Sequence, residues 1–285
     1  MLRKLPPCYP SYNDFKNADM KFLLSLSIVI LNVMTSFSQT PKKAETVTLN
    51  GIDIYYEVYG TGEPLFLLHG FTQSSKSWLP YISHYENTFE IYLVDLRGHG
   101  KSSWFKEKIN LRSVAKDVDA LAGHLKLDRI NAIGYSYGGE VLFQLALVHP
   151  DLVKSMIIIG SCGTWHANEF PDFVQYLSYK NINNLPWMRE QQTNEEQIKS
   201  ILAQMPNYNV TVSEEELKSI RTRTLIVHGD KDIATPVECV AKAKQNIPNS
   251  FLWVLPNTEH GAHTGEHKEA FIRISKEFFS GDWSK

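Results

Sequence analysis

The chain has 285 residues, of which 43% are hydrophobic and 21% are charged, a composition typical of a globular protein with room for one large domain. Its 29 basic and 31 acidic side chains give a formal net charge of −2. This balance speaks against the basic surface of a nucleic-acid-binding protein, so we expect no nucleic acid among the partners.

An apolar run near the N-terminus predicts export. Phe22–Met34 follows a basic residue and precedes small residues at Ser36 and Ser38, which is the pattern of a secretory signal peptide. The run is shorter than the about 20 residues of a membrane-spanning helix, so no stable span is expected after cleavage. We expect translation to start at Met20, with residues 1–38 forming an N-terminal extension plus signal peptide. The alternative is an uncleaved N-terminal membrane anchor.

From residue 39 onward, predicted strands and helices alternate. The dipeptide Asn50-Gly51 is a strong hairpin signal between the first two strands, and apolar residues recur at helical spacing over 111–125. This alternation favours an α/β fold with a mostly parallel, doubly wound sheet, to which the opening hairpin adds antiparallel strands at one edge. The expected strands are 46–49, 52–58, 65–68, 90–94, 129–134, 154–159, 224–227 and 251–255, and the expected helices are 74–84, 111–125, 140–149, 236–246 and 266–279.

Residues 163–220 interrupt the alternation. They contain no clear strand pattern and mix polar runs with large apolar side chains, so we expect a small helical insertion. Its aromatic residues could line a substrate pocket or pack the insertion onto the domain beneath, and the sequence leaves both possibilities open. These large side chains are Trp165, Phe170, Phe173, Tyr176, Tyr179, Trp187, Met188, Met205 and Tyr208.

The most informative motif is Gly134-Tyr135-Ser136-Tyr137-Gly138. It joins a strand pattern to a helical pattern, which is the arrangement of a nucleophile elbow. Glycine is needed two residues before and two residues after the serine, because a Cβ there would collide with backbone in so tight a turn. The same five residues could also form an ordinary glycine-rich turn, so the rest of the chain decides their meaning.

A serine nucleophile needs a base, and the base needs an acid that orients it. In open α/β sheets such groups gather beyond the carboxyl ends of strands. His260 follows one predicted strand, and Asp230 and Asp232 follow another. We expect His260 as the base and Asp232 as the acid, with Asp230 serving the turn through bonds to backbone. The order Ser136, Asp232, His260 is the one expected of this fold.

Two backbone N–H groups are also needed to hold the oxyanion of the reaction intermediate. The elbow offers the N–H of Tyr137. The loop after the strand at 65–68 begins His69-Gly70-Phe71, and Gly70 permits a close turn that would aim the N–H of Phe71 into the site.

These segments together resemble the α/β-hydrolase family, in its order and spacing from Val47 to Phe279. The resemblance implies Ser136 as nucleophile, Asp232 as acid and His260 as base. It also implies that residues 39–285 form the α/β-hydrolase domain, with 163–220 as a cap over the pocket. The matching segments are His69-Gly70-Phe71, Asp95–Ser102, Gly134–Gly139, Gly229–Asp232 and Leu255–His260.

Three details qualify the resemblance. The Asp95–Ser102 stretch resembles a structural loop common to the family and receives no catalytic role. Relatives with an aspartate nucleophile, the haloalkane dehalogenases and epoxide hydrolases, are disfavoured because Ser136 stands at the elbow. Glu259 stands where many relatives have glycine before the catalytic His, which could alter the loop or the pKa of His260.

Export implies an oxidising compartment. In the mature chain two cysteines remain, Cys162 and Cys239. They could pair, but each follows a different predicted strand, so two buried free thiols are expected.

Two other classes of protein compete with a hydrolase. His260, His263 and His267 with a neighbouring glutamate could bind a metal, but the glycines among them indicate a loop, and we expect no metal and no cofactor. A non-catalytic binding protein on the same scaffold would lack a member of the triad, and none is missing.

The sequence therefore predicts a serine hydrolase that cleaves a carboxylic ester through an acyl-enzyme, with a small-molecule acyl compound as its partner. Family resemblance leaves lactonases, carbon–carbon bond hydrolases, lyases and peptidases as alternatives, because fold does not fix substrate. The sequence does not determine the oligomeric state.

Overall fold

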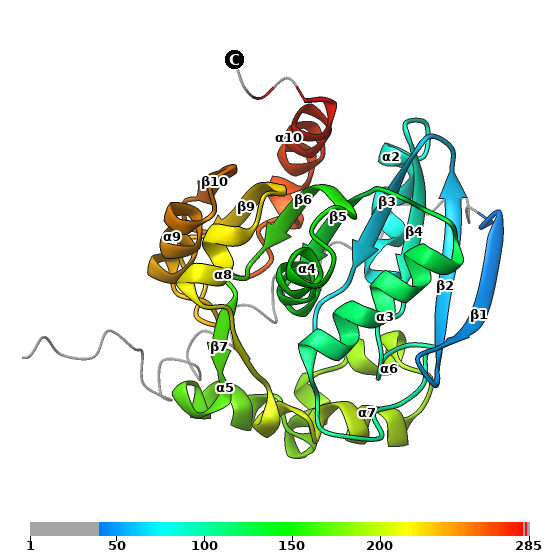
Figure 1. The fold of residues 1–285 in the computed structure, drawn as a ribbon. Coiled ribbons are helices and arrows are strands. Elements are labelled where there is room, and N and C mark those ends of the chain that lie inside the picture. The colour runs from blue at the N-terminus through cyan, green and yellow to red at the C-terminus, as the bar shows by residue number, and fades with distance from the viewer. Residues whose placement is uncertain (1–39, 282, 284–285) are drawn as a thin grey trace, which may run out of the picture. The chain divides into compact units, whose positions relative to one another are not determined.

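A computed structural model describes residues 40–281 and 283 and places eight strands in one sheet, in the order β1-β2-β4-β3-β5-β6-β9-β10 (Figure 1). The strands from β4 to β10 are parallel, and β2 is antiparallel to both its neighbours. The prediction of a mostly parallel sheet is thus confirmed. Within this sheet the hairpin contributes one antiparallel strand, β2, and the other seven strands share one direction. The strands are β1 Lys43–Leu49, β2 Ile52–Gly60, β3 Glu63–Leu68, β4 Phe89–Val94, β5 Ile130–Tyr135, β6 Val153–Ile159, β9 Arg223–Gly229 and β10 Ser250–Leu255.

The predicted signal peptide and the predicted start at Met20 lie outside the described residues. From Pro41 onward the described residues form one compact unit. Across 40–281 and 283, no helix is both long and apolar enough to cross a membrane.

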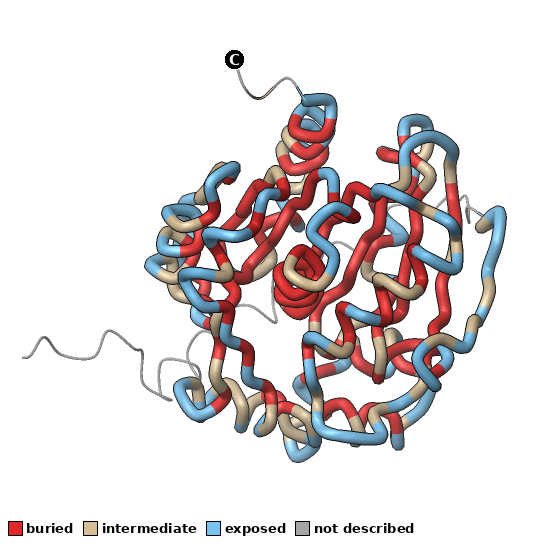
Figure 2. Tube along the Cα trace, in the orientation of Figure 1, coloured by how far each residue is buried: buried red, intermediate tan, exposed pale blue. Residues whose placement is uncertain are grey.

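Helices cover both faces of the sheet because its strands are apolar on both sides. Successive residues of a strand point to opposite faces, and in β3 Phe66 belongs to one core and Leu67 to the other. The first core includes α3, α4 and α9, and the second includes α2 and α10. Figure 2 shows α4 buried almost throughout its length. These helices are η1 Ser75–Tyr81, α2 Ile82–Tyr85, α3 Leu111–His124, α4 Tyr137–Val148, α9 Val237–Asn246, η5 Gly265–His267 and α10 Lys268–Ser280.

The cap segment, residues 163–220, lies between β6 and β9 and is mostly helical, as predicted. It also contains two short strands that pair in an antiparallel sheet, so the expectation of no strand there was wrong. Strands of three residues are too short for an alternating pattern, and they pair across most of the segment. Its elements are β7 Thr164–His166, η2 Ala167–Glu169, α5 Pro171–Tyr176, η3 Tyr179–Asn184, α6 Trp187–Gln191, α7 Glu195–Leu202, η4 Met205–Asn207, β8 Asn209–Thr211 and α8 Glu214–Ser219.

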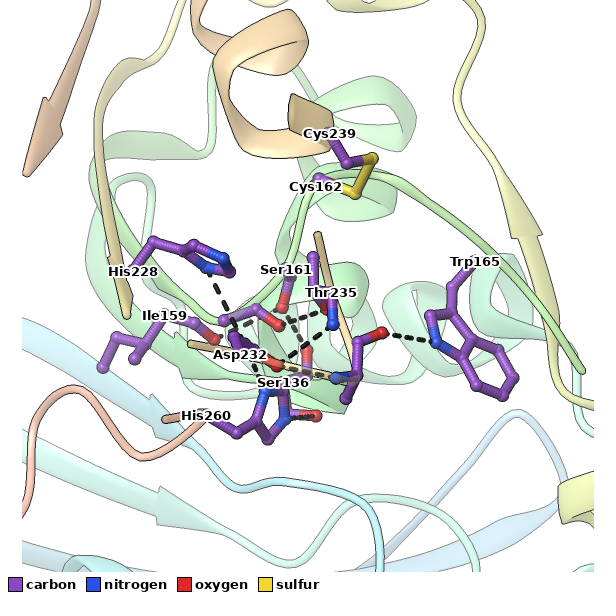
Figure 3. A network of polar contacts seen from close by, with 12 residues as sticks. Ser136, Ile159, Ser161, Cys162, Trp165, His228, Asp232, Thr235, Cys239 and His260 are labelled. Atoms are coloured by element: carbon purple, nitrogen blue, oxygen red, sulfur yellow. Dashed lines mark hydrogen bonds and ion pairs between the residues drawn. A yellow bond between two sulfur atoms is a disulfide. The ribbon is translucent and has the colours of Figure 1, made fainter. Parts of the chain in front are cut away.

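Cys162 and Cys239 form a disulfide (Figure 3), so the expectation of two free thiols was wrong. Cys162 lies just beyond β6, and Cys239 lies on α9, which follows β9. Because β6 and β9 are neighbours in the sheet, the segments that follow them leave the same edge side by side. The cap segment separates the two strands in sequence, which hides this proximity. The Cα atoms are 5.7 Å apart, a usual spacing for a disulfide.

The disulfide is expected to stabilise the domain by restricting the unfolded chain. Replacing both residues, Cys162→Ser with Cys239→Ser, should lower the free energy of unfolding by about 2–4 kcal/mol, because the bond closes a long loop. Urea unfolding of both proteins measures this. A reductant should destabilise the wild type and leave the stability of the double variant unchanged. Equal urea midpoints for the two proteins without reductant would contradict the expectation.

Candidate active site

Ser136 lies in a tight turn between β5 and α4. Its φ is 50° and its ψ is −112°, outside the regions that L-residues favour. A Cβ on Gly134 would lie 2.4 Å from the carbonyl oxygen of Gly138, and a Cβ on Gly138 would lie 2.4 Å from that of Leu68. Both glycines are therefore required by close backbone contact, as the elbow motif predicts.

The structure brings Ser136, His260 and Asp232 together (Figure 3). The distance between Ser136 Oγ and His260 Nε2 is 2.8 Å, and that between His260 Nδ1 and Asp232 Oδ2 is 2.7 Å. A carboxylate can only accept hydrogen bonds, so the Nδ1–H of His260 donates to Asp232 and the Nε2 lone pair faces the Ser136 hydroxyl.

Asp232 is buried and its hydrogen bonds hold it in place. Its Oδ1 accepts from the backbone N–H groups of Ala234 at 2.9 Å and Thr235 at 3.0 Å, which leaves Oδ2 for His260. A second buried histidine, His228, places its Nδ1 3.8 Å from the same Oδ2, and burial lowers the pKa of His228, which favours its neutral form.

The other sequence candidates lie apart from this chain of contacts. Asp230 Oδ1 accepts from the N–H of Thr258 at 3.1 Å, which is the turn role predicted for it. His267 contacts Thr258 Oγ1, and His263 is packed among aromatic rings. Within residues 40–281 and 283, no group of three or more His, Cys, Asp or Glu side chains is arranged to hold a metal ion.

The surroundings of His260 shift its pKa. Burial lowers it, but the charge of Asp232 and the hydrogen bond to Asp232 together outweigh burial and hold the pKa of His260 above its ordinary value. The nearby His263 has no such partner, and burial, with a smaller effect from His260, lowers its pKa to about 3. Of these two histidines, His260 is the one better suited to carry a proton.

The loop after β3 packs against the elbow. A Cβ on Gly138 would also lie 2.9 Å from the carbonyl oxygen of His69, and the rings of Phe71 and Tyr137 are 5.8 Å apart. His69 braces the loop, because its Nδ1–H donates to the Gly70 carbonyl and its Nε2 accepts from the Leu96 N–H. The structure thus brings the two predicted oxyanion residues, Phe71 and Tyr137, side by side next to Ser136. Tyr137 is the first residue of α4, so its N–H has no partner within the helix.

Hydrogen bonds of Asp95 hold the Asp95–Ser102 loop in place. Asp95 accepts hydrogen bonds from the backbone N–H groups of Ser75 and Lys101, at 2.7 and 2.8 Å. The first contact connects the loop to the start of η1, and the second lies within the loop.

Aromatic side chains of the cap segment reach the elbow. The ring of Tyr208 lies 5.7 Å from that of Phe71 and 6.0 Å from that of Tyr137, and Trp165 lies 5.2 Å from Tyr208. The Trp165 Nε1–H donates to the Ala234 carbonyl at 2.8 Å, which connects the cap segment to the loop that carries the acid. These contacts confirm that Trp165 and Tyr208 pack the cap segment onto the domain beneath; that the aromatic residues line a substrate pocket stays a prediction.

The residues directly after β6 also contact the site, and no sequence motif pointed to them. Gly160 lies against His260, since a Cβ there would be 3.0 Å from the imidazole. The backbone N–H groups of Cys162 and Gly163 donate to Glu140 Oε1 at 3.1 and 3.2 Å. Burial raises the pKa of Glu140 to about 7, although these two bonds lower it. No local pattern marks such long-range contacts.

Replacing Asp232 should change the titration of His260. In Asp232→Asn the charge that raises the pKa of His260 is gone while burial remains, so that pKa should fall. NMR titration of the His260 ring measures it. Asp230→Asn is the matched control, because that carboxylate contacts only the turn, and it should leave the His260 pKa near the wild-type value. An unchanged His260 pKa in Asp232→Asn would show that Asp232 and His260 do not interact as the structure indicates.

Comparison with known proteins agrees with this architecture. The family model described as "alpha/beta hydrolase fold" matches residues 63–202. A pimeloyl-[acyl-carrier protein] methyl ester esterase of Nitrosomonas europaea is 26% identical over 246 residues, 73% of this chain and 92% of the relative. A soluble epoxide hydrolase of a Corynebacterium species is 37% identical, but over 111 residues, which are 39% of each chain.

Solved structures share the fold. A meta-cleavage product hydrolase from Pseudomonas fluorescens superposes with a TM-score of 0.71 at 18% identity, covering 84% of this chain and 98% of that one. The strand order, the elbow and the family match agree with one another. The chain belongs to the α/β-hydrolase family and is a hydrolase of that fold.

Proposed function

We propose that the protein is a serine hydrolase that cleaves a carboxylic ester through an acyl-enzyme on Ser136. One observation carries the proposal, namely the continuous hydrogen-bonded chain from Ser136 through His260 to Asp232. A serine hydroxyl is a weak nucleophile, and such a chain is the arrangement that activates it.

In the first half of the proposed reaction, His260 Nε2 takes the proton of Ser136 as Oγ attacks the ester carbonyl. The backbone N–H groups of Phe71 and Tyr137 stabilise the negative oxygen of the tetrahedral intermediate. The intermediate collapses, the bond to the alcohol oxygen breaks, and His260 returns the proton to that oxygen. The acyl group is then bound to Ser136.

In the second half, His260 takes a proton from a water molecule, which attacks the acyl carbonyl. The intermediate collapses, Ser136 recovers its proton from His260, and the carboxylic acid leaves. Asp232 holds the imidazole in one tautomer and stabilises its charged form in both halves. Its burial suits this role, because a charge acts more strongly where water is excluded.

The aromatic side chains beside the elbow favour a substrate with an apolar group. Phe71 and Tyr137 from the core and Tyr208 from the cap segment lie in ring contact, and apolar side chains of this kind suit an apolar group of a substrate. Among simple esters, p-nitrophenyl butyrate should therefore be a better substrate than the acetate.

The same groups could also open a lactone, which is an internal ester, or act on other acyl compounds. A panel of esters, lactones, thioesters and amino-acid arylamides separates these alternatives. A purely ligand-binding protein would turn over none of them and would be stabilised by a ligand without product.

Ser136→Ala should lower kcat/KM for p-nitrophenyl butyrate by about 10³-fold or more, because the nucleophile is lost while the rest of the site stays. Steady-state hydrolysis and labelling by a fluorophosphonate measure this. Asp230→Asn should retain activity near the wild-type level. Wild-type rates in Ser136→Ala would overturn the assignment of the nucleophile.

We also propose that the protein is exported. The motivating observations are the signal-like residues 20–38 and the Cys162–Cys239 disulfide, since disulfides persist mainly in oxidising compartments. Fractionation of the producing cells and N-terminal sequencing should find a mature chain that lacks Phe22–Met34. Membrane-bound protein that retains this run would support the anchored alternative, and intact protein in the cytosol would refute export.

A further inference from the structure

The segment directly after β6 contacts Ser136, His260 and the loop that carries Asp232, and Figure 3 shows Ser161 beside Ser136. Gly160 lies against the imidazole of His260 and accepts a hydrogen bond from Thr235 Oγ1 at 3.2 Å, on the loop of Asp232. Ser161 contacts Ser136. Of these residues, Ser161 is the one whose side chain reaches the backbone of the nucleophile.

We propose that Ser161 is a positioning residue that sets the orientation of the Ser136–Tyr137 peptide, and so directs the Tyr137 N–H toward the oxyanion. This role rests on the proposed acyl-transfer function. Ser161 does not touch the substrate and acts only through that peptide.

The Ser161 hydroxyl is placed to make this contact. The side chain is buried, and its Oγ lies 2.6 Å from the Ser136 carbonyl oxygen and 3.4 Å from that of Ile159. A hydroxyl has one proton to donate, and the shorter contact is within ideal hydrogen-bond distance while the longer one is not. The hydroxyl therefore donates to Ser136.

The geometry of the peptide group carries this effect to the site. The Ser136 carbonyl accepts from Ser161, in the segment after β6, and from the N–H of Glu140 in α4, at 3.0 Å. In a planar trans peptide the C=O and the following N–H point in opposite directions. Fixing the Ser136 oxygen on one side therefore fixes the direction of the Tyr137 N–H on the other.

The elbow needs such an anchor because its backbone is strained. Ser136 has a φ of 50°, and residues in such conformations persist only where their surroundings hold them. The Ser136 N–H also donates to the Ile159 carbonyl at 2.7 Å. Hydrogen bonds from the end of β6 and from the residues after it thus hold both sides of the nucleophile.

Ser161 is itself held in place. A Cβ on Gly139 would lie 2.4 Å from Ser161 Oγ, so the second glycine after the nucleophile makes room for this hydroxyl. The following residues are bound to Glu140 through two backbone N–H groups, and the disulfide joins Cys162 to α9. The donor therefore has little freedom to leave the Ser136 carbonyl.

The test compares Ser161→Ala with Ser250→Ala. Ser250 is a buried serine at the start of β10, the end of that strand remote from His260, and its hydroxyl also donates to a backbone carbonyl, that of Ile247, at 2.7 Å. Both variants lose one buried hydrogen bond, so both should lose stability. Only Ser161→Ala should lower kcat for p-nitrophenyl butyrate, by about 5- to 50-fold, with KM changed less than about twofold. This loss in kcat is smaller than the roughly 10²–10³-fold loss on removing an oxyanion donor, because the Tyr137 N–H is still present.

Two readouts identify the oxyanion as the origin of the loss. The rate at which a fluorophosphonate labels Ser136 should fall in Ser161→Ala by a factor close to that in kcat. Inhibition by a trifluoromethyl ketone, which forms a tetrahedral oxyanion on the serine, should weaken by a similar factor, whereas inhibition by the product butyrate should stay unchanged.

Wild-type kcat and wild-type labelling in Ser161→Ala would overturn the positioning role and leave the proposed function intact. Equal weakening of the ketone and of butyrate, or the same kinetic change in Ser250→Ala, would also overturn it, since these indicate a general structural effect. A wild type that hydrolyses no acyl substrate and takes no label would contradict the proposed function itself, and the positioning role with it.

Discussion

Ser136 has a positive φ in the turn at the carboxyl end of β5. In this turn the backbone atoms of β3, β5 and α4 lie so close together that neither Gly134 nor Gly138 can carry a side chain. Such conformations cost on the order of 1–3 kcal/mol and last only where neighbouring structure enforces them. Here the sheet and α4 supply that enforcement. The arrangement of the rest of the site depends on this turn, because it decides where the Ser136 hydroxyl and the Tyr137 N–H lie.

Parallel pairing of β5, β6, β9 and β10 brings the remaining groups to the same edge. Each of these strands is followed by a different part of the site, since the elbow follows β5, the acid loop follows β9 and the His260 loop follows β10. The segment after β6 lies in the middle of them, contacts its neighbours on both sides and begins the cap segment. The Trp165 hydrogen bond to Ala234 attaches the cap segment to the loop of Asp232, and the disulfide attaches the residue just before the cap segment to α9.

Most strands and helices could be predicted from the sequence, because each depends on a local pattern of residues. The strands of the sheet, the hairpin at Asn50-Gly51 and the long amphipathic helix α3 all agree with their predicted positions within a few residues. The predicted helix at 74–84 is instead a 3₁₀ helix of seven residues followed by one turn of α-helix. Pro80 is consistent with the change, since proline has no backbone N–H to donate. For the site, Ser136, Asp232 and His260 could be named because each follows a strand, and chain order selected the pairing.

What the sequence by itself determined is therefore the set of elements and the residue types at their ends, since hydrophobic periodicity and glycine positions act over a few residues. Only the tertiary structure decided which ends meet. It joined Cys162 to Cys239, paired β7 with β8 across the cap segment, and placed Ser161 on the Ser136 carbonyl. Each of these contacts joins residues far apart in the chain. Such contacts form only when strands separated by long insertions pair in one sheet, and local sequence patterns carry no information about that pairing.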